Sequence, residues 1–224
     1  MSQPKGKISE IFKSIQGEGL YQGQAQVFVR FFGCNLTCRF CDTKLDSYQE
    51  FSIDELMSKI AFFDNYHSVS LTGGEPLVQV EFLRELSQRL KKAGKLVYLE
   101  TNGTLYQNLK QVIDSIDIVA MDFKLPSSTE SKDFWFMHRE FLKVAQTKEV
   151  FIKAVIGKAS RVEDLRIALA VIKEVNKDLL FVLQPENPYE EELKGKLNYF
   201  EKVCKERNIN LSVVSQLHKI LGVK

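Results

Sequence analysis

The chain has little cysteine, no large excess of charge of one sign and no long apolar run. Its 224 residues include 4 cysteines, and 31 basic residues against 29 acidic ones give a formal net charge of +2. This near-balance argues against a large nucleic-acid surface. No stretch approaches the ~20 apolar residues that a membrane-spanning helix needs. Four cysteines are also too few for a disulfide framework in a chain of this length.

The first residues and the overall composition suggest a reducing compartment and a single compact domain. Residues 1–7 are polar and no apolar run follows them, so we expect no signal peptide. Thiols that must stay reduced then favour a cytoplasmic protein. A content of 44% hydrophobic and 27% charged residues suits one globular domain. The chain contains no internal repeat, low-complexity tract or linker.

Short apolar runs rich in Val, Ile, Leu and Phe alternate with longer amphipathic segments. Seven runs are predicted as strands: 26–33, 68–72, 95–100, 116–123, 150–156, 179–184 and 210–214. Helices are predicted over 80–93, 161–176 and 189–208, and Ser52 with Glu55 forms a capping box that starts another. Strands of this kind are typical of βα units in a mostly parallel sheet with helices outside. A closed eight-stranded barrel takes about 250 residues, so the α/β fold predicted is a partial, open βα barrel.

Three of the four cysteines lie together after the first predicted strand. Cys34, Cys38 and Cys41 have the spacing C-x3-C-x2-C. Four thiolates would close a zinc site or saturate an iron–sulfur cluster, whereas three on one loop leave one iron of a [4Fe–4S] cluster open. A zinc site with three cysteines and a histidine stays open as an alternative, although all three histidines lie far away in sequence. Cys204 falls in a helical pattern and is predicted to be a buried apolar side chain.

Small and polar residues cluster where the predicted strands end. Residues 72–76 (Thr-Gly-Gly-Glu-Pro) follow the second strand, 100–103 (Glu-Thr-Asn-Gly) end the third, and 122–124 (Asp-Phe-Lys) end the fourth. The active site of a parallel βα sheet lies at this edge. Paired glycines let backbone carbonyls approach a ligand. Each motif also has an ordinary interpretation, because Gly-Gly and Asn-Gly are common turns and Asp122 could simply pair with Lys124.

The segment before the first strand carries polar residues that a barrel does not require. Residues 16–19 read Gln-Gly-Glu-Gly, and Arg30 lies inside the strand that follows. Together they could bind a polar heterocycle. Gln16 would use its amide, Glu18 would accept N–H groups, and Arg30 would grip a carboxylate through two hydrogen bonds.

The cysteine spacing, with Phe40 before the last cysteine, and the Gly-Gly-Glu-Pro motif resemble radical S-adenosylmethionine (SAM) enzymes. In that family the open iron of a [4Fe–4S] cluster chelates SAM, whose cleavage yields a 5′-deoxyadenosyl radical. The order of all the motifs resembles more narrowly the 7-carboxy-7-deazaguanine synthase family. This likeness includes Thr43 and the segment 216–219 (Gln-Leu-His-Lys) and runs from residue 8 to the end of the chain.

The resemblance implies a reaction and a role for each matching residue. The substrate would be 6-carboxy-5,6,7,8-tetrahydropterin, whose ring contracts with loss of ammonia to give the deazapurine of queuosine and related bases. The implied cluster ligands are Cys34, Cys38 and Cys41, and Thr43 is the implied Mg²⁺ ligand. The implied SAM contacts are Phe40, Gly73, Gly74, Glu75, Glu100, Asn102, Asp122 and Lys124. The implied substrate contacts are Gln16, Gly17, Glu18, Gly19, Arg30, Gly74, Gln216 and His218.

The resemblance also implies partners and a division of the chain. It implies a flavodoxin or ferredoxin as electron donor and a homodimer. It divides the single domain 1–224 into an N-terminal substrate-loop extension (1–25), a barrel (26–215) and a substrate-contacting tail (216–224). The aromatic segment 126–146 matches no motif and is interpreted as a helix packed on the sheet or a dimer contact.

Two other functions remain open at this point. A small radical SAM activase, which installs a glycyl radical on a ribonucleotide reductase, would share the cysteine loop and the Gly-Gly-Glu-Pro motif. It has little reason to carry the 16–19 loop together with Arg30. A non-catalytic iron–sulfur or zinc protein has no reason to carry glycine-rich motifs at several consecutive strand ends.

Overall fold

The computed structural model describes residues 4–39, 41, 43, 46–217 and 221–222. Within them, nine strands form one sheet in the order β3-β1-β2-β4-β5-β6-β7-β8-β9. The strands are β1 (Gly6–Ile15), β2 (Ala25–Phe31), β3 (Gln49–Phe51), β4 (Ser68–Gly73), β5 (Val97–Thr101), β6 (Ile118–Asp122), β7 (Glu149–Ile156), β8 (Phe181–Pro185) and β9 (Leu211–Val213). The order is linear, and no pairing between β3 and β9 closes it. The predicted open barrel is therefore confirmed.

All seven predicted strands are present, and each is parallel to its neighbours from β2 to β9. The sequence did not predict β1 and β3, which add an antiparallel ribbon beyond β2. The reason lies in β1, whose register shifts between Ile8 and Glu10. Such a bulge breaks the alternation of inward and outward side chains that identifies a strand in sequence.

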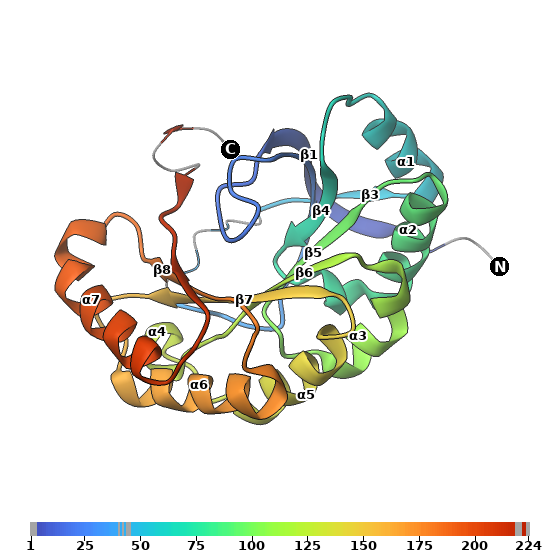
Figure 1. Ribbon diagram of the computed structural model, residues 1–224. Helices are drawn as coiled ribbons and strands as arrows, with labels where there is room; N and C mark the ends of the chain where they lie inside the picture. The colour runs from blue at the N-terminus through green and yellow to red at the C-terminus, as the bar shows by residue number, and fades with distance from the viewer. Residues whose placement is uncertain (1–3, 40, 42, 44–45, 218–220, 223–224) are drawn as a thin grey trace.

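Helices cover the outer face of the curved sheet (Figure 1). They are α1 (Ile53–Ala61), α2 (Val80–Lys92), α3 (Tyr106–Val112), α4 (Pro126–Thr129), α5 (Trp135–Ala145), α6 (Val162–Asn176) and α7 (Glu190–Glu206), with 3-10 turns at η1 (Pro76–Gln79) and η2 (Ile113–Ser115). The capping box is confirmed, because the Ser52 side chain accepts from Glu55 and the Glu55 side chain accepts from Ser52. Segment 126–146 contains α4 and α5, and α5 buries Phe141 and Leu142 against the core.

The two faces of the sheet differ in chemistry. Outward side chains such as Val29, Leu71 and Leu99 are fully buried in one apolar core with the helices. The inner face carries only a small apolar cluster, which includes Tyr98 and Phe151. Much of the rest of the buried inner face is polar, and these polar residues are Gln26, Ser68, Ser70, Thr72, Asp122 and Gln184. Buried polar side chains need partners, so the barrel interior is built as a network and not as a second core.

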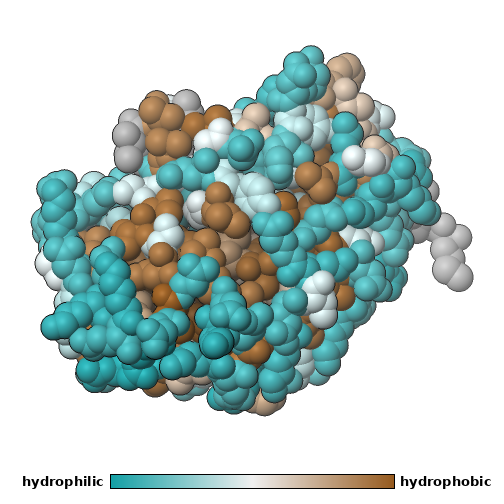
Figure 2. All heavy atoms as spheres, viewed as in Figure 1, coloured by the Kyte–Doolittle hydropathy of each residue, from teal (hydrophilic) through white to brown (hydrophobic). Residues whose placement is uncertain are grey.

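Charged side chains cover the outer helices, and apolar ones gather across the middle of the same view (Figure 2). No helix in the described part of the chain has both the length and the apolar character that crossing a bilayer requires.

Candidate active site

The cysteine loop leaves β2 at the carboxyl edge of the sheet. Cys34, Cys38 and Cys41 are unpaired thiols that are exposed or partly buried. The Leu36 N–H donates to Cys34 Sγ over 3.4 Å, and the Cys41 thiol donates to the Thr43 carbonyl over 3.8 Å. Burial raises the pKa of the Cys38 thiol, and the nearby Lys124 ammonium opposes that rise.

The donor set fits an iron–sulfur cluster better than a single metal ion. Among the described residues, no three His, Cys, Asp or Glu side chains lie close enough to hold one ion. Cysteines of a [4Fe–4S] cluster bind separate irons and therefore stand farther apart than the ligands of one ion. Three free thiols on one loop meet this requirement and leave one iron for another ligand. Cys204 is fully buried in α7, as the sequence predicted.

The Gly-Gly-Glu-Pro motif forms backbone hydrogen bonds that hold the end of β4 against the start of the cysteine loop. Gly73 has φ +129°, and a Cβ there would lie 2.2 Å from the Phe31 carbonyl oxygen. The Gly74 N–H donates to that carbonyl over 3.1 Å, and the Glu75 N–H donates to the Gly33 carbonyl over 2.9 Å. Only glycine allows this approach of two backbones.

Glu75 braces the next strand end. Its carboxylate is fully buried and accepts from the Asn102 N–H (2.7 Å), the Thr101 hydroxyl (3.0 Å) and the Leu77 N–H (3.1 Å). Burial raises the pKa of Glu75 to about 7 despite these donors. These contacts hold the ends of β4 and β5 together.

Asn102 connects the end of β5 to the cysteine loop. Its Nδ2 donates to Asn35 Oδ1 over 2.9 Å and lies 3.9 Å from Cys34 Sγ. The ring nitrogen Nε2 of His138, on α5, lies 3.2 Å from the Asn102 carbonyl oxygen, and the ring stacks on Phe123 at 4.7 Å and 5°. Burial lowers the pKa of His138 to about 3. A neutral histidine on α5 thus packs against the ends of β5 and β6, a role that the sequence did not reveal.

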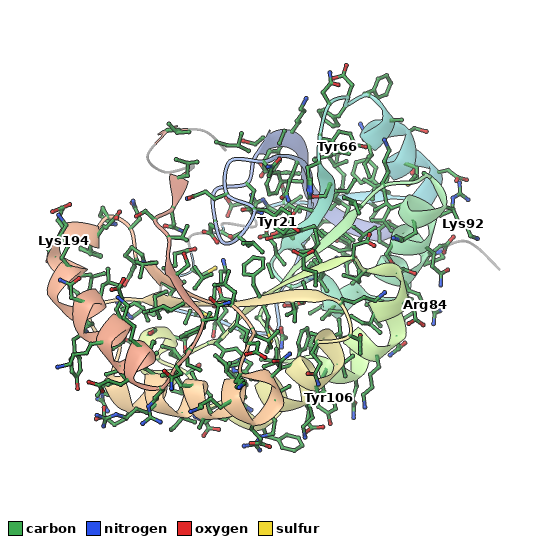
Figure 3. All side chains as sticks on the ribbon, in the orientation of Figure 1. Tyr21, Tyr66, Arg84, Lys92, Tyr106 and Lys194 are labelled. Atoms are coloured by element: carbon green, nitrogen blue, oxygen red, sulfur yellow. The ribbon has the colours of Figure 1, made fainter. Side chains whose placement is uncertain are left out.

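The predicted substrate loop enters the barrel at the end where the parallel strands begin. Gln16 Nε2 donates to Glu100 Oε1 over 2.8 Å and to Gln26 Oε1 over 3.0 Å. Glu100 also accepts from the hydroxyls of Ser70 and Thr72. Tyr21, labelled in Figure 3, anchors the loop. Its ring contacts the rings of Tyr98 and His67, and its hydroxyl donates to Glu149.

Two glycines of this loop make close contacts with other parts of the chain. Gly19 has φ +65°, and a Cβ there would lie 2.3 Å from the Phe151 ring. The Gly17 carbonyl accepts from Gln22 Nε2 and from the Leu217 N–H. Residues 16–19 and residues 216–217 of the C-terminal tail, both predicted to contact substrate, therefore lie side by side.

A row of charged groups crosses the interior. Gln216 Nε2 donates to Glu18 Oε1 over 2.7 Å, and Lys153 donates to the other oxygen of Glu18. Lys153 Nζ also lies 3.7 Å from Asp122 Oδ2, which pairs with Lys124 at 2.8 Å. Burial lowers the pKa of Lys153, but Glu18, Asp122 and Glu100 raise it more, so the side chain is a permanent cation. Lys153 was not predicted from the sequence, where its only signal is a single lysine inside the apolar run 150–156.

Three further residues were predicted as site residues, and the structure describes one of them. Arg30 Nε pairs with Glu10 Oε2 at 3.0 Å, and its guanidinium lies over the Phe12 ring, so it is held by β1. Phe40 and His218 lie outside the described residues.

Two buried acceptor atoms mark where a ligand would fit. Asp122 Oδ1 and Gln184 Oε1 have no hydrogen-bond partner within the described structure. Both belong to inward-facing side chains at the carboxyl ends of β6 and β8. Buried orphan acceptors in a native fold indicate a donor that is supplied by something else. Gln184 is the second site residue that the sequence did not reveal.

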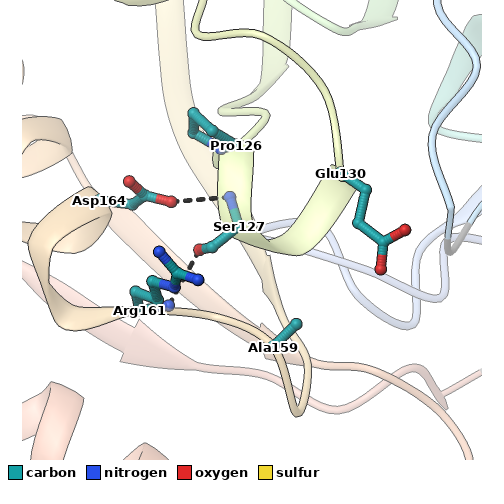
Figure 4. Close-up of a pocket in the computed structure, with 6 residues that line it drawn as sticks. All are labelled: Pro126, Ser127, Glu130, Ala159, Arg161 and Asp164. Atoms are coloured by element: carbon teal, nitrogen blue, oxygen red, sulfur yellow. Dashed lines mark hydrogen bonds between the residues drawn. The ribbon is translucent and has the colours of Figure 1, made fainter.

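A separate cavity lies outside the barrel interior. It has a volume of about 420 Å³ and lies between α4 and the start of α6 (Figure 4). Polar groups that line it form hydrogen bonds with one another, since the Ser127 N–H donates to Asp164 and the Arg161 N–H donates to the Ser127 hydroxyl. We do not assign the reaction to it.

Comparison with known proteins gives one consistent result. Residues 28–193 match the radical SAM superfamily. The 7-carboxy-7-deazaguanine synthase of Geobacter sulfurreducens is 34% identical over 99% of this chain and 99% of that protein. The enzyme of the same name from Methanospirillum hungatei is 34% identical over 97% of this chain and 86% of its own length. The crystal structure of QueE from Escherichia coli shares the fold, with a TM-score of 0.66 and 23% identity over 93% of each chain.

The close approach at Gly73 predicts a local and severe effect of adding a methyl group. Gly73→Ala should lower the free energy of unfolding by roughly 1–3 kcal/mol from backbone strain alone, and the contact with the Phe31 carbonyl adds to that loss. Gly195→Ala is the control, because Gly195 lies within α7 with open space around it and should gain about 0.5–1 kcal/mol. Equal urea-denaturation midpoints for the two variants would contradict this account.

The buried His138 predicts a defined dependence of stability on pH. Its pKa is about 3 in the folded protein, against an ordinary value of 6.5 for a histidine exposed to water. Between these values the unfolded chain binds more protons, so the histidine's contribution to stability is present above pH 6.5 and falls on acidification. The limit of this loss is about 1.4 kcal/mol per pH unit.

His138→Phe keeps the ring and removes the titration, so its unfolding free energy should fall less steeply than wild type between pH 7 and pH 5. Urea unfolding at three pH values measures both slopes. Parallel slopes for wild type and variant would show that His138 does not carry this dependence.

Proposed function

Since this chain belongs to the radical SAM superfamily and to its 7-carboxy-7-deazaguanine synthase family, we propose that its open barrel converts 6-carboxy-5,6,7,8-tetrahydropterin to 7-carboxy-7-deazaguanine with loss of ammonia. The observation that carries this function is the polar interior. The Gln-Gly-Glu-Gly loop enters it and meets the C-terminal tail at Glu18 and Gln216. The cysteine loop lies at the carboxyl edge of the same sheet.

Membership of the superfamily implies a [4Fe–4S] cluster and SAM. When bound, the reduced cluster and SAM supply the 5′-deoxyadenosyl radical that abstracts hydrogen from the substrate. Cys34, Cys38 and Cys41 would hold three irons of the cluster. The reducing electron must come from another protein, and a flavodoxin or ferredoxin is the donor we propose.

The residues proposed to bind SAM lie along the carboxyl edge of β4, β5 and β6. Gly73 and Gly74 offer backbone carbonyls for its ammonium, which needs acceptors. Asp122 contributes an acceptor through the oxygen that has no partner among the described residues, and Lys124 pairs with its other oxygen. Asn102 and Glu100 complete this row of polar groups at the carboxyl edge, which we call the rim. Glu75 holds the rim in place. Phe40 stays a prediction from the family.

The substrate is proposed to lie between this rim and the 16–19 loop. Glu18 accepts N–H groups of the pterin, Gln16 uses its amide, and Arg30 supplies the cation for the carboxylate. Gly17, Gly19 and Gln216 shape the loop and hold Glu18. His218 is proposed as a further contact on the family pattern, as is a homodimer. Three carboxylates surround Lys153, so the interior favours a ligand rich in N–H donors, as a pterin is.

A magnesium ion is proposed to bind the substrate carboxylate and the Thr43 hydroxyl. A lone hydroxyl is a weak protein ligand, but Mg²⁺ keeps several waters and takes ligands from substrates. Thr43 lies two residues after the last cysteine and is partly buried. The proposed ion would therefore bind beside the cysteine loop and not within the row of interior charges.

Turnover by anaerobically reconstituted protein tests the function. With SAM, Mg²⁺, reductant and 6-carboxytetrahydropterin, mass spectrometry should detect 7-carboxy-7-deazaguanine. Cys38→Ala should abolish both this product and 5′-deoxyadenosine, because one iron loses its ligand. Cys204→Ala is the control and should keep the activity, since that thiol is buried in α7 away from the loop. Formation of 5′-deoxyadenosine without the deazaguanine would keep the radical SAM class and reject the substrate.

The magnesium proposal predicts a selective effect at Thr43. Thr43→Val keeps the shape and removes the hydroxyl, so the Mg²⁺ concentration needed for half-maximal turnover should rise by about tenfold, the usual scale for losing one supporting metal contact. The affinity for SAM without substrate should not change. An unaltered Mg²⁺ dependence in this variant would reject Thr43 as a ligand.

A further inference from the structure

Lys153 occupies a position in the interior that neither the motifs nor the family resemblance assigned. It lies on the inward face of β7 and contacts carboxylates from two distant parts of the chain. One is Glu18, on the loop that follows β1, and the other is Asp122, at the end of β6. The side chains of Lys153, Glu18 and Asp122 are 14%, 18% and 10% exposed. At this burial, removal of one partner leaves the other charge uncompensated and is costly.

The contacts of Glu18 define the orientation of its carboxylate. Gln216 donates to Oε1 and Lys153 donates to Oε2. Donors on both oxygens fix the plane of the carboxylate, which a single donor would leave free to rotate. Gln216 is neutral, whereas Lys153 also compensates the charge. The lysine therefore both orients the Glu18 carboxylate and compensates its charge in a largely buried site.

We propose that Lys153 is a positioning residue of the substrate site, which holds Glu18 ready for the substrate's N–H groups and links it to Asp122 on the SAM side. The proposal rests on the function proposed above. Lys153 acts as a fixed cation and not as a general base, because the three surrounding carboxylates keep it charged. Its strand position also explains why a single charged residue interrupts an otherwise apolar run.

The link to Asp122 has a consequence for binding. Asp122 Oδ2 is shared by Lys124 at 2.8 Å and Lys153 at 3.7 Å. When substrate N–H groups bind Glu18, they share that carboxylate with Lys153, and the ammonium interacts more strongly with Asp122. Substrate binding thereby changes the electrostatic surroundings of the SAM site. Any such coupling must be reciprocal, so each ligand alters the affinity for the other by the same factor.

The test compares three variants of the reconstituted holoenzyme. Lys153→Met removes the charge with little change of shape, Lys153→Arg keeps the charge, and Lys91→Met removes an ion-paired lysine outside the interior. Calorimetry measures pterin binding in the presence of SAM, turnover gives KM and kcat, and electron paramagnetic resonance of the reduced cluster reports SAM binding without substrate.

Lys153→Met should weaken pterin binding and raise KM by about tenfold or more, as expected when a buried charge pair loses one partner. The change in kcat should be smaller, SAM binding without substrate should stay as in wild type, and the effect of the pterin on SAM affinity should disappear. Lys153→Arg should recover most of the pterin affinity. Lys91→Met should match wild type in every binding measurement.

Three results would overturn the proposal. They are unchanged pterin affinity in Lys153→Met, equal damage in Lys153→Met and Lys153→Arg, and loss of SAM binding without substrate in Lys153→Met. If Lys153→Met does not fold, the comparison uses Glu18→Gln, Lys153→Arg and the double variant instead. Losses of pterin affinity that simply add in the double variant would reject the pairing of Glu18 with Lys153. Wild-type protein that binds the pterin without converting it would reject the proposed function, while the binding comparison would still test Lys153. Wild-type protein that does not bind the pterin would reject both.

Discussion

The buried carboxylate of Glu75 is the interaction on which the carboxyl edge of the barrel depends. A carboxylate taken out of water needs several donors, and here two backbone N–H groups and the Thr101 hydroxyl supply them. One of those N–H groups belongs to Asn102, whose side chain reaches Asn35 and Cys34. The position of the cysteine loop relative to β5 therefore follows from satisfying one charge at the end of β4. The elevated pKa of Glu75, about 7, shows that three donors only partly offset its burial.

A second network fills the barrel interior from the opposite end. An inner face of Gln, Ser, Thr and Asp side chains cannot pack as an apolar core, so each polar group must find a partner. The 16–19 loop supplies many of them through Gln16 and Glu18. Its entry requires a glycine at position 19, where the backbone meets the Phe151 ring. The 16–19 loop is thus a structural part of the barrel, although it connects two adjacent antiparallel strands.

The sequence predicted the periodic elements and the local motifs well, and the contacts across the barrel poorly. Strands β2 and β4–β9, the Ser52 capping box and the buried Cys204 follow from patterns within a few residues. The bulge in β1 removed such a pattern, and that strand was missed. Glu18 and Lys153 are 135 residues apart, and no local pattern identifies them as partners. The pairing of Arg30 with Glu10 depends on the register of β1 against β2, which no local pattern predicts. The role of His138 likewise depends on packing between α5 and two strand ends.

Lys153 links Glu18 of the interior network to Asp122 at the end of β6, and this link explains a division of roles among the charged residues. Radical hydrogen abstraction depends on the position of the substrate and needs no protein group to transfer a proton in that step. Lys153 is accordingly paired with Glu18 and Asp122, and burial holds the pKa of His138 far below neutral pH, so neither residue is suited to acid–base catalysis. Lys153 stays charged and His138 stays neutral, and both hold other residues. In this barrel, electrostatics serves mainly to orient ligands. The interior charged residues with two partners are therefore the most important ones, because the loss of such a residue would release two elements of the site together.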